Sequence, residues 1–220
     1  MTTLLRFPRG LYGITPEWDD TDRLIAAIEQ AAAGGMAALQ WRRKAAHPDD
    51  SITQALRVRQ RCHELGVLCI INDDWRLATI IDADGVHLGR DDGSIAQART
   101  ALGTDKLIGR SCYDDLGLAR QAMADGADYI AFGSMYPSFI KPDAVRASLD
   151  TLRAARTLAD TQTAGLPSMG RAAVVAIGGI TPDNAAPVID AGADSIALIS
   201  GLFDAPDIRA AASRCQALFA

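Results

Sequence analysis

Gly126-Ala127-Asp128-Tyr129-Ile130-Ala131 is one of four segments in which small residues and a glycine come before or within a short apolar run. The other three are Gly34-Gly35-Met36-Ala37-Ala38-Leu39, Ala83-Asp84-Gly85-Val86-His87-Leu88 and Gly192-Ala193-Asp194-Ser195-Ile196-Ala197. Glycine ends helices in a left-handed turn, and an apolar run of this kind is typical of a strand that is buried on both faces. Such strands belong to parallel sheets covered by helices, so the four segments indicate an α/β protein.

Further apolar runs complete a set of eight expected strands. They lie near Leu11–Ile14, Ala37–Trp41, Val67–Ile71, Gly85–Leu88, Leu107–Gly109, Tyr129–Phe132, Ala173–Ile177 and Ser195–Ile199. Helical spacing of apolar residues occurs between them, at Thr21–Ala33, Trp75–Ile81, Asp114–Asp125, Asp207–Leu218 and in a stretch with Pro182 near its first turn that runs to Ala191. Strand and helix alternating eight times predict a single (β/α)8 TIM barrel over residues 1–220. A doubly wound open sheet is the structural alternative.

The composition is that of an ordinary globular protein and sets limits on its partners. The chain has 220 residues, of which 49% are hydrophobic, and a formal net charge of -5. This charge disfavours a general nucleic-acid or acidic-membrane surface, and the sequence lacks an apolar run long enough to span a bilayer. Four cysteines without a CxxC pair are expected to be reduced thiols in a soluble, cytoplasmic protein. Small-molecule substrates are the expected partners, and the formation of a homo-oligomer stays open.

Polar and glycine residues follow nearly every expected strand. In barrels of this kind the carboxyl ends of the strands meet at one rim, which carries the active site. The residues in question are Arg42, Arg43 and Lys44 after the second strand, Asn72, Asp73 and Asp74 after the third, Gly89, Arg90, Asp91 and Asp92 after the fourth, Ser111 at the end of the fifth, Lys141 beyond the sixth, Gly178 and Gly179 after the seventh, and Ser200 and Gly201 after the eighth.

Two glycine-bearing loops, Gly178-Gly179 and Ile199-Ser200-Gly201, favour a phosphate site. Glycine lets the backbone approach an anion closely, and backbone N–H groups at strands seven and eight are the usual phosphate ligands of these barrels. The alternative is that these glycines only shape turns.

Asp73 and Asp92 end neighbouring strands and are candidate metal ligands. Two carboxylates brought together repel each other unless a proton or a cation lies between them. Mg²⁺ suits this position because it takes one or two protein carboxylates and completes its octahedron with water and phosphate oxygens. The alternative is a pair of solvated loop acids or helix N-caps, and Asp74 and Asp91 are also candidates for capping.

Three cations, Arg42, Lys44 and Lys141, could neutralise a pyrophosphate, because guanidinium and ammonium groups pair with phosphate oxygens. A solvated basic loop is the alternative. His63 is expected in a helix and His87 within a strand, and both are interpreted as structural residues.

These motifs, taken in order, resemble those of the thiamine-phosphate synthase family over nearly the whole chain. They are Leu11-Tyr12-Gly13-Ile14-Thr15, Gln40-Trp41-Arg42-Arg43-Lys44, Ile71-Asn72-Asp73-Asp74-Trp75-Arg76-Leu77-Ala78, Asp84-Gly85-Val86-His87-Leu88-Gly89-Arg90-Asp91-Asp92, Gly109-Arg110-Ser111, Gly133 to Lys141, Ile177-Gly178-Gly179-Ile180 and Ile199-Ser200.

The resemblance implies an enzyme that joins 4-amino-2-methyl-5-hydroxymethylpyrimidine diphosphate to a thiazole phosphate by a dissociative substitution. It assigns Mg²⁺ to Asp73 and Asp92. It assigns catalysis to Lys141, Ser111 and Arg42. The residues implied to bind the pyrimidine diphosphate are Gln40, Trp41, Arg42, Arg43, Lys44, Asn72, Ser111 and Lys141. Those implied to bind the thiazole phosphate are Ser138, Phe139, Ile140, Gly179, Ile199 and Ser200.

The chain departs from the family pattern after strand six, where Ile140 stands in place of a hydroxyl residue. Trp41 also replaces a typical aliphatic residue, and Arg43 stands where an acidic residue is frequent. Three alternatives stay open. A thiazole tautomerase on the same scaffold is disfavoured because Tyr113 occupies the position of that family's histidine. A non-catalytic phosphate-binding barrel and an unrelated phosphate-binding barrel enzyme are the others.

Overall fold

The computed structural model describes residues 4–44, 48–137, 145–162 and 170–220. Within these ranges eight parallel strands close into a barrel in chain order, with β8 paired to β1. The strands are β1 Gly10–Ile14, β2 Met36–Trp41, β3 Leu68–Asn72, β4 Gly85–Leu88, β5 Leu107–Tyr113, β6 Tyr129–Phe132, β7 Ala173–Ile177 and β8 Ser195–Leu198. The predicted (β/α)8 barrel is therefore confirmed, and the closure excludes the open sheet.

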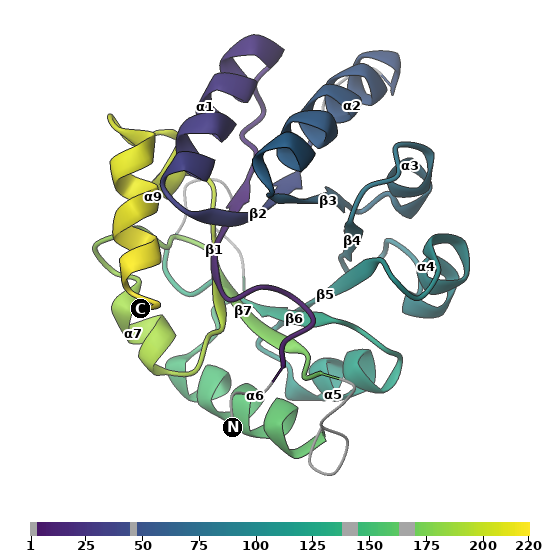
Figure 1. Ribbon diagram of the computed structural model, residues 1–220. Helices are drawn as coiled ribbons and strands as arrows, with labels where there is room; N and C mark the ends of the chain where they lie inside the picture. The colour runs from purple at the N-terminus through teal and green to yellow at the C-terminus, as the bar shows by residue number, and fades with distance from the viewer. Residues whose placement is uncertain (1–3, 45–47, 138–144, 163–169) are drawn as a thin grey trace.

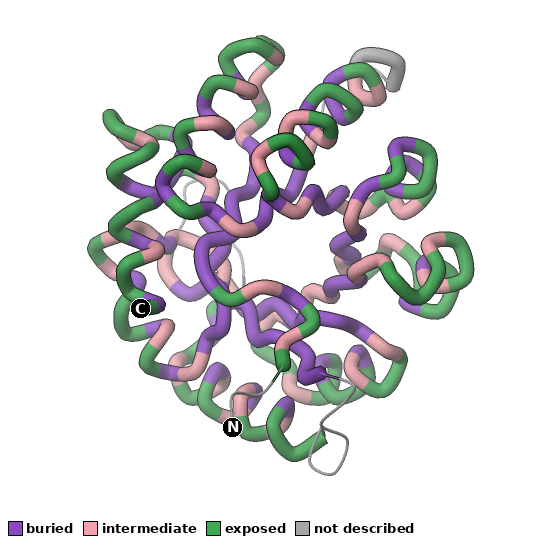
Figure 2. Tube along the Cα trace, in the orientation of Figure 1, coloured by how far each residue is buried: buried purple, intermediate pink, exposed green. Residues whose placement is uncertain are grey.

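Helices surround the barrel and cover the outer face of its strands (Figure 1). They are α1 Thr21–Ala33, α2 Pro48–Leu65, α3 Trp75–Ile80, α4 Ile95–Leu102, α5 Leu116–Ala124, α6 Leu149–Gln162, α7 Ala186–Asp190, α8 Ser200–Phe203 and α9 Ile208–Ala217. Figure 2 shows that the strands at the centre are mostly buried, whereas the outward faces of the surrounding helices are exposed.

Two predicted element boundaries are wrong. The fifth strand was expected to stop near Gly109, but β5 continues to Tyr113, with side chains alternating between the cavity and the outer layer. Pro182 was expected in the first turn of a helix, but α7 begins at Ala186 and Pro187 occupies that position. A turn comes first, because the Asn184 side chain accepts a hydrogen bond from the Thr181 N–H at 2.8 Å.

Three of the four repeated segments carry an aspartate that hydrogen-bonds to the preceding strand. Asp84, Asp128 and Asp194 stand just before β4, β6 and β8. Their carboxylates accept backbone N–H bonds from Cys69, Ile108 and Val174 at 2.7, 2.7 and 2.8 Å. A charged acceptor makes a stronger bond than a neutral one, so these residues fix the register at the amino ends of the strands.

The barrel interior is filled by inward-facing side chains and closed at one end by the N-terminal segment. Phe7 is fully buried, and its ring lies 5.0 Å from that of Tyr12 and 4.3 Å from that of Tyr129. Arg6 forms an ion pair with Asp128, at the amino end of β6, so this segment covers the amino ends of the strands. The open end of the barrel is the opposite one.

Position 109 requires glycine because the Tyr129 ring fills the space that a side chain at this position would occupy. A Cβ at position 109 would lie 1.9 Å from Cζ of that ring. We expect Gly109→Ala to lower the free energy of unfolding by about 1–3 kcal/mol, since overpacking a filled core displaces its neighbours. This corresponds to a Tm lower by roughly 2–12 °C for a chain of this size. Thermal unfolding followed by circular dichroism measures it. The control Gly117→Ala, on the exposed side of α5, should change Tm little or raise it.

Candidate active site

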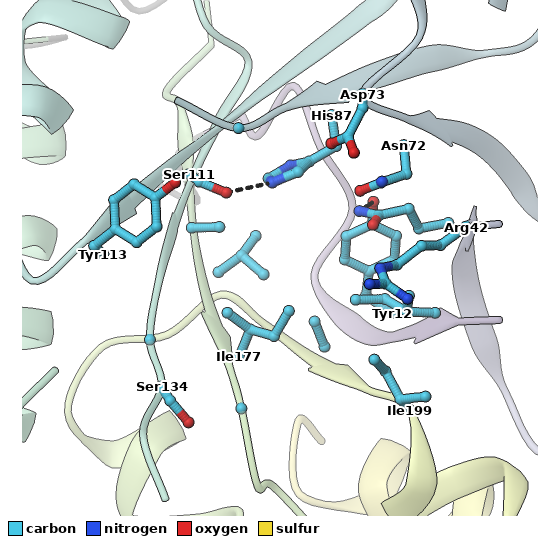
Figure 3. Close-up of a pocket in the computed structure, with 18 of the residues that line it drawn as sticks. Tyr12, Arg42, Asn72, Asp73, His87, Ser111, Tyr113, Ser134, Ile177 and Ile199 are labelled. Carbon is cyan, nitrogen blue, oxygen red and sulfur yellow. Dashed lines mark hydrogen bonds between the residues drawn. The ribbon is translucent and has the colours of Figure 1, made fainter. Parts of the chain in front are cut away.

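A cavity of about 540 Å³ opens at the carboxyl ends of the strands. This volume lies in the range that holds a small-molecule ligand. The floor is formed by inward-facing side chains such as Ile14, Val175 and Ile177, and polar residues from the strand ends form the walls. In Figure 3, Arg42, Asn72 and Asp73 gather on one side, whereas Ser134 and Ile199 lie toward the other end, with Ile177 between them.

Most of the predicted site residues that the structure describes meet in this cavity. Those that line it are Gln40, Arg42, Lys44, Asn72, Asp73, Asp92, Ser111, Gly179, Ile199 and Ser200. They come from six strands and the segments that follow them, so the closure of the barrel is what brings residues up to 160 positions apart to one place.

Trp41 and Arg43 are not brought to the cavity. The Trp41 side chain is buried between the barrel and the helices, where its indole N–H donates to Gln54 Oε1 at 3.2 Å. Arg43 donates to the carbonyl oxygen of Trp18 and to Asp19. Successive residues of an extended chain point to opposite faces, so Gln40 and Arg42 face inward while Trp41 and Arg43 face outward. The predicted residues Ser138, Phe139, Ile140 and Lys141 lie outside the described residues.

Asp73 and Asp92 face each other across Gly89. A Cβ at Gly89 would lie 2.7 Å from Asp92 Oδ2 and 4.0 Å from Asp73 Oδ1. The Asp92 carboxylate is held by the Gly89 N–H at 2.8 Å. Burial, and then the neighbouring Asp92, raise the pKa of Asp73, while Lys44 opposes this shift. Asp73 also has a φ of 65°, in the left-handed region that aspartate adopts more readily than most non-glycine residues.

Asp74 and Asp91 were both candidates for helix capping, and only Asp74 caps a helix. Asp74 is the N-cap of α3, where its carboxylate accepts from the N–H groups of Arg76 and Leu77. Asp91 does not cap α4, because Ser94 does so with a capping box to Gln97, and Asp91 lines the cavity instead.

Two cations of the cavity, Arg42 and Lys44, are paired with carboxylates. Arg42 Nη1 lies 2.8 Å from Glu17 Oε1, and Lys44 Nζ lies 3.3 Å from Asp73 Oδ2. Both pairs are partly exposed, and exposed ion pairs are weak, so an anionic ligand can compete for these cations.

The glycines at strands seven and eight allow close backbone packing. Gly178 and Gly179 have φ angles of 98° and 64°. A Cβ on Gly178 would lie 2.3 Å from Ser134 Oγ, and one on Gly179 would lie 2.5 Å from the Pro137 carbonyl oxygen. Ser200 begins the short helix α8, whose first N–H groups have no partner within the helix. The two glycines and Ser200 line the cavity, and their neighbours Ser134 and Ile199 lie at the end away from Asp73 (Figure 3).

Sequence reasoning missed His87 and Tyr12 as cavity residues. The His87 ring lines the cavity and contacts Ser111 Oγ through Nε2 at 2.9 Å (Figure 3). Burial lowers the pKa of His87 to about 4, so this imidazole is neutral near pH 7. The sequence signal that could have placed His87 in the cavity was the alternation of side chains along β4. Val86 and Leu88 pack in the outer layer, so His87 between them must face inward.

Arg90 also lines the cavity, and its guanidinium lies 4.9 Å from the ring of Tyr113.

Among the described residues, no cluster of three or more His, Cys, Asp or Glu side chains could hold a metal ion. None of the helices in the described part of the chain has the length and apolar character needed to span a membrane.

A (β/α)8 barrel with paired carboxylates, cations and glycine loops at one rim defines an enzyme that acts on phosphorylated small molecules. A family model described as thiamine monophosphate synthase matches residues 11–202. The chain belongs to this family, which confirms the resemblance and the assignment to transferase enzymes of thiamine biosynthesis.

Individual relatives agree with the family match. The chain is 57% identical to a thiamine-phosphate synthase of Bordetella avium over 98% of this chain and 97% of that protein. It is 54% identical to one of Thiobacillus denitrificans over 97% and 96%. Among solved structures, a thiamine phosphate pyrophosphorylase from Pyrococcus furiosus superposes with a TM-score of 0.81 at 32% identity, covering 97% of this chain and 96% of that one.

Proposed function

We propose that the cavity joins 4-amino-2-methyl-5-hydroxymethylpyrimidine diphosphate to a thiazole phosphate and releases thiamine phosphate and pyrophosphate. The supporting observation is a single cavity whose two ends carry different polar groups, each suited to an anion. One end has cations and paired carboxylates, and the other has glycine-rich backbone. Two substrates that each carry phosphate need such an arrangement, because their reacting carbon and nitrogen must meet between the two anionic groups.

The diphosphate end consists of side chains from strands two to five. Arg42, Lys44 and Ser111 would donate hydrogen bonds to the diphosphate, and Gln40 and Asn72 would hold the pyrimidine ring. Lys141 is proposed as a further cation from the sequence alone. Ligand binding would draw Arg42 away from Glu17 and Lys44 away from Asp73, since a diphosphate carries more charge than one carboxylate.

The chemistry of Asp73 and Asp92 fits Mg²⁺. Both offer hard oxygen ligands, and burial together with the neighbouring Asp92 raises the pKa of Asp73. A site with only two protein carboxylates suits Mg²⁺ because this ion keeps waters and takes phosphate oxygens as its other ligands. When bound, Mg²⁺ would supply positive charge that stabilises the departing diphosphate.

The thiazole phosphate would lie at the other end. Backbone N–H groups of Gly179 and Ser200 would hold its phosphate, and Ile199 would contact the ring. Ser138, Phe139 and Ile140 are proposed for this end from the sequence alone.

The proposed reaction breaks a C–O bond and forms a C–N bond. The bonding pair leaves with the pyrophosphate, a pyrimidine-methyl cation forms, and the thiazole nitrogen captures it with its lone pair. The donors around the diphosphate stabilise charge that grows in the transition state. The neutral His87 adds no competing positive charge beside the forming carbocation. The apolar floor of Val175 and Ile177 limits the access of water to it.

An assay with the purified full-length chain tests this function. Incubated with both substrates and Mg²⁺, the protein should form thiamine phosphate and pyrophosphate in equal amounts, and neither when one substrate is left out. Conversion of one thiazole phosphate tautomer into another without coupling would identify the tautomerase instead. Binding of both substrates without any product would indicate a non-catalytic phosphate-binding barrel.

Lys141→Ala should lower kcat more than it raises KM. A cation that acts on the leaving group matters most in the transition state, and loss of such a donor typically costs about 10²–10³-fold in kcat. Steady-state kinetics with each substrate varied in turn measure the two constants. Lys106→Ala is the matched control, because Lys106 pairs with Asp82 near the amino end of β5, away from the cavity. A raised KM with unchanged kcat would show that Lys141 only binds.

We also propose that residues 1–220 act as one domain in the cytoplasm on small-molecule substrates. The closed barrel supports the single domain, since its first and last strands pair with each other. Homo-oligomer formation stays an open prediction that light scattering of the purified chain would test.

A further inference from the structure

A continuous chain of hydrogen bonds runs through the barrel interior and ends at two substrate-facing side chains. Gln40 Nε2 donates to the Tyr12 hydroxyl at 2.8 Å, and the Tyr12 and Tyr129 hydroxyls lie 3.0 Å apart. The Tyr129 hydroxyl lies 3.1 Å from His87 Nδ1. His87 Nε2 lies 2.9 Å from Ser111 Oγ. Gln40 and Ser111 line the cavity, whereas the Tyr129 hydroxyl lies beneath it.

The two tyrosines in the middle of this chain are buried, although Tyr12 also borders the cavity. Tyr12 and Tyr129 are 1% and 0% exposed, and the Phe7 ring packs against both. The His87 and Tyr129 rings stack with their centroids 5.5 Å apart. A buried polar group without a partner is costly, so the hydroxyl hydrogens of Tyr12 and Tyr129 and the ring hydrogen of His87 have to find acceptors among the neighbouring groups of this chain.

That requirement fixes the direction of the bonds. Because Tyr12 accepts from Gln40, its single hydrogen goes to Tyr129. Tyr129 must then donate its own hydrogen to His87 Nδ1. A neutral imidazole with an acceptor at Nδ1 carries its hydrogen on Nε2, so His87 donates to Ser111 Oγ.

We propose that Tyr129 is a positioning residue that acts through His87 to point the Ser111 hydroxyl hydrogen into the cavity, where it donates to the diphosphate. The identity of this acceptor rests on the proposed function. With the other tautomer, Ser111 would donate to His87 and would present oxygen lone pairs to the anion, which would repel it. The tautomer of one buried histidine therefore decides whether Ser111 attracts or repels the leaving group.

The tautomer of His87 can be measured without substrate. The chain has three histidines, so ¹⁵N-labelled protein gives few imidazole signals, and those of His87 are identified by their loss in His87→Asn. The wild-type protein should show His87 as a neutral Nε2–H tautomer. In Tyr129→Phe the Nδ1 shift should move toward that of a nitrogen without a hydrogen-bond donor, or the tautomers should mix. A wild-type Nδ1–H tautomer, or shifts unchanged by Tyr129→Phe, would overturn the proposal.

Kinetics then test the link to Ser111. Phenylalanine keeps the ring that packs over Gly109 and against Phe7, so Tyr129→Phe removes only the hydroxyl. We expect kcat to fall about three- to tenfold, as for the loss of one hydrogen bond, with the KM for the thiazole phosphate unchanged. In a Ser111→Ala background the same substitution should have no further effect. Independent, multiplicative losses would contradict the proposal.

The two measurements separate this inference from the proposed function. If the chain failed to form thiamine phosphate while His87 showed the Nε2–H tautomer, the function would be wrong and the positioning of Ser111 would stand for another anion. If Tyr129→Phe did not fold, the wild-type tautomer and the Tyr12→Phe variant, which interrupts the chain one bond earlier, would decide it.

Discussion

Asp92→Asn should lose about 10³-fold in kcat/KM, because several kcal/mol of leaving-group stabilisation depend on the metal that this carboxylate is proposed to hold. Asparagine keeps a carbonyl oxygen to accept from the Gly89 N–H, so the loop and the Tm should change little. Part of the lost activity should return at high Mg²⁺ concentration, since Asp73 and the substrate phosphates remain as ligands. Steady-state assays over a series of Mg²⁺ concentrations measure this.

Two controls accompany that experiment. Excess chelator should abolish turnover of the wild-type protein. Asp105→Asn, an exposed carboxylate just before β5, should leave activity unchanged. Undiminished activity of the wild-type protein in excess chelator, or an Asp92→Asn variant as active as wild type, would contradict the proposed metal site.

The second large effect concerns stability. Asp194→Asn should lower the free energy of unfolding by about 3–5 kcal/mol, because it leaves a buried guanidinium without its charge partner. Arg171 and Asp194 are 2% and 4% exposed, and their two parallel hydrogen bonds are each 2.7 Å long. Asp160 also pairs with Arg171 and would keep the loss near the lower end of this range. The Tm should fall by roughly 6–20 °C.

Thermal and urea unfolding measure this loss. Asp150→Ala is the matched control, because it breaks an exposed ion pair with Arg153 on α6 and should cost no more than about 1 kcal/mol. Activity of folded Asp194→Asn at 25 °C should equal that of wild type, since the pair lies at the amino ends of the strands. Similar unfolding curves for the two variants would show that the Arg171 pair contributes little to stability.

The fold could be predicted because strands that are buried on both faces appear in the sequence as apolar runs. Predicted and observed strands agree to within about a residue at most ends. β5 is the exception, since beyond Gly109 it extends into the rim and carries Arg110, Ser111 and Tyr113. A strand that is only partly buried has no continuous apolar run to mark its end.

The site could be predicted in part because position at a strand end is visible in the sequence. Asp73, Asp92 and Ser111 were identified in this way, and the structure places all three at the cavity. Trp41 and Arg43 were predicted as site residues because they stand in a contiguous segment that resembles the family. Neighbouring residues of a strand face opposite sides, so these two side chains point away from the cavity. The contact between Tyr12 and Tyr129 joins residues 117 positions apart, so only the closed barrel reveals it.

We propose above that one cavity holds the two anionic groups at opposite ends. A crystal structure of the protein with thiamine phosphate, pyrophosphate and Mg²⁺ would show whether it does. We expect pyrophosphate against Arg42 and Lys44, Mg²⁺ held by Asp73 and Asp92, and the phosphate of thiamine phosphate on the backbone of Gly179 and Ser200. The opposite arrangement, or products bound outside the mouth of the barrel, would contradict it.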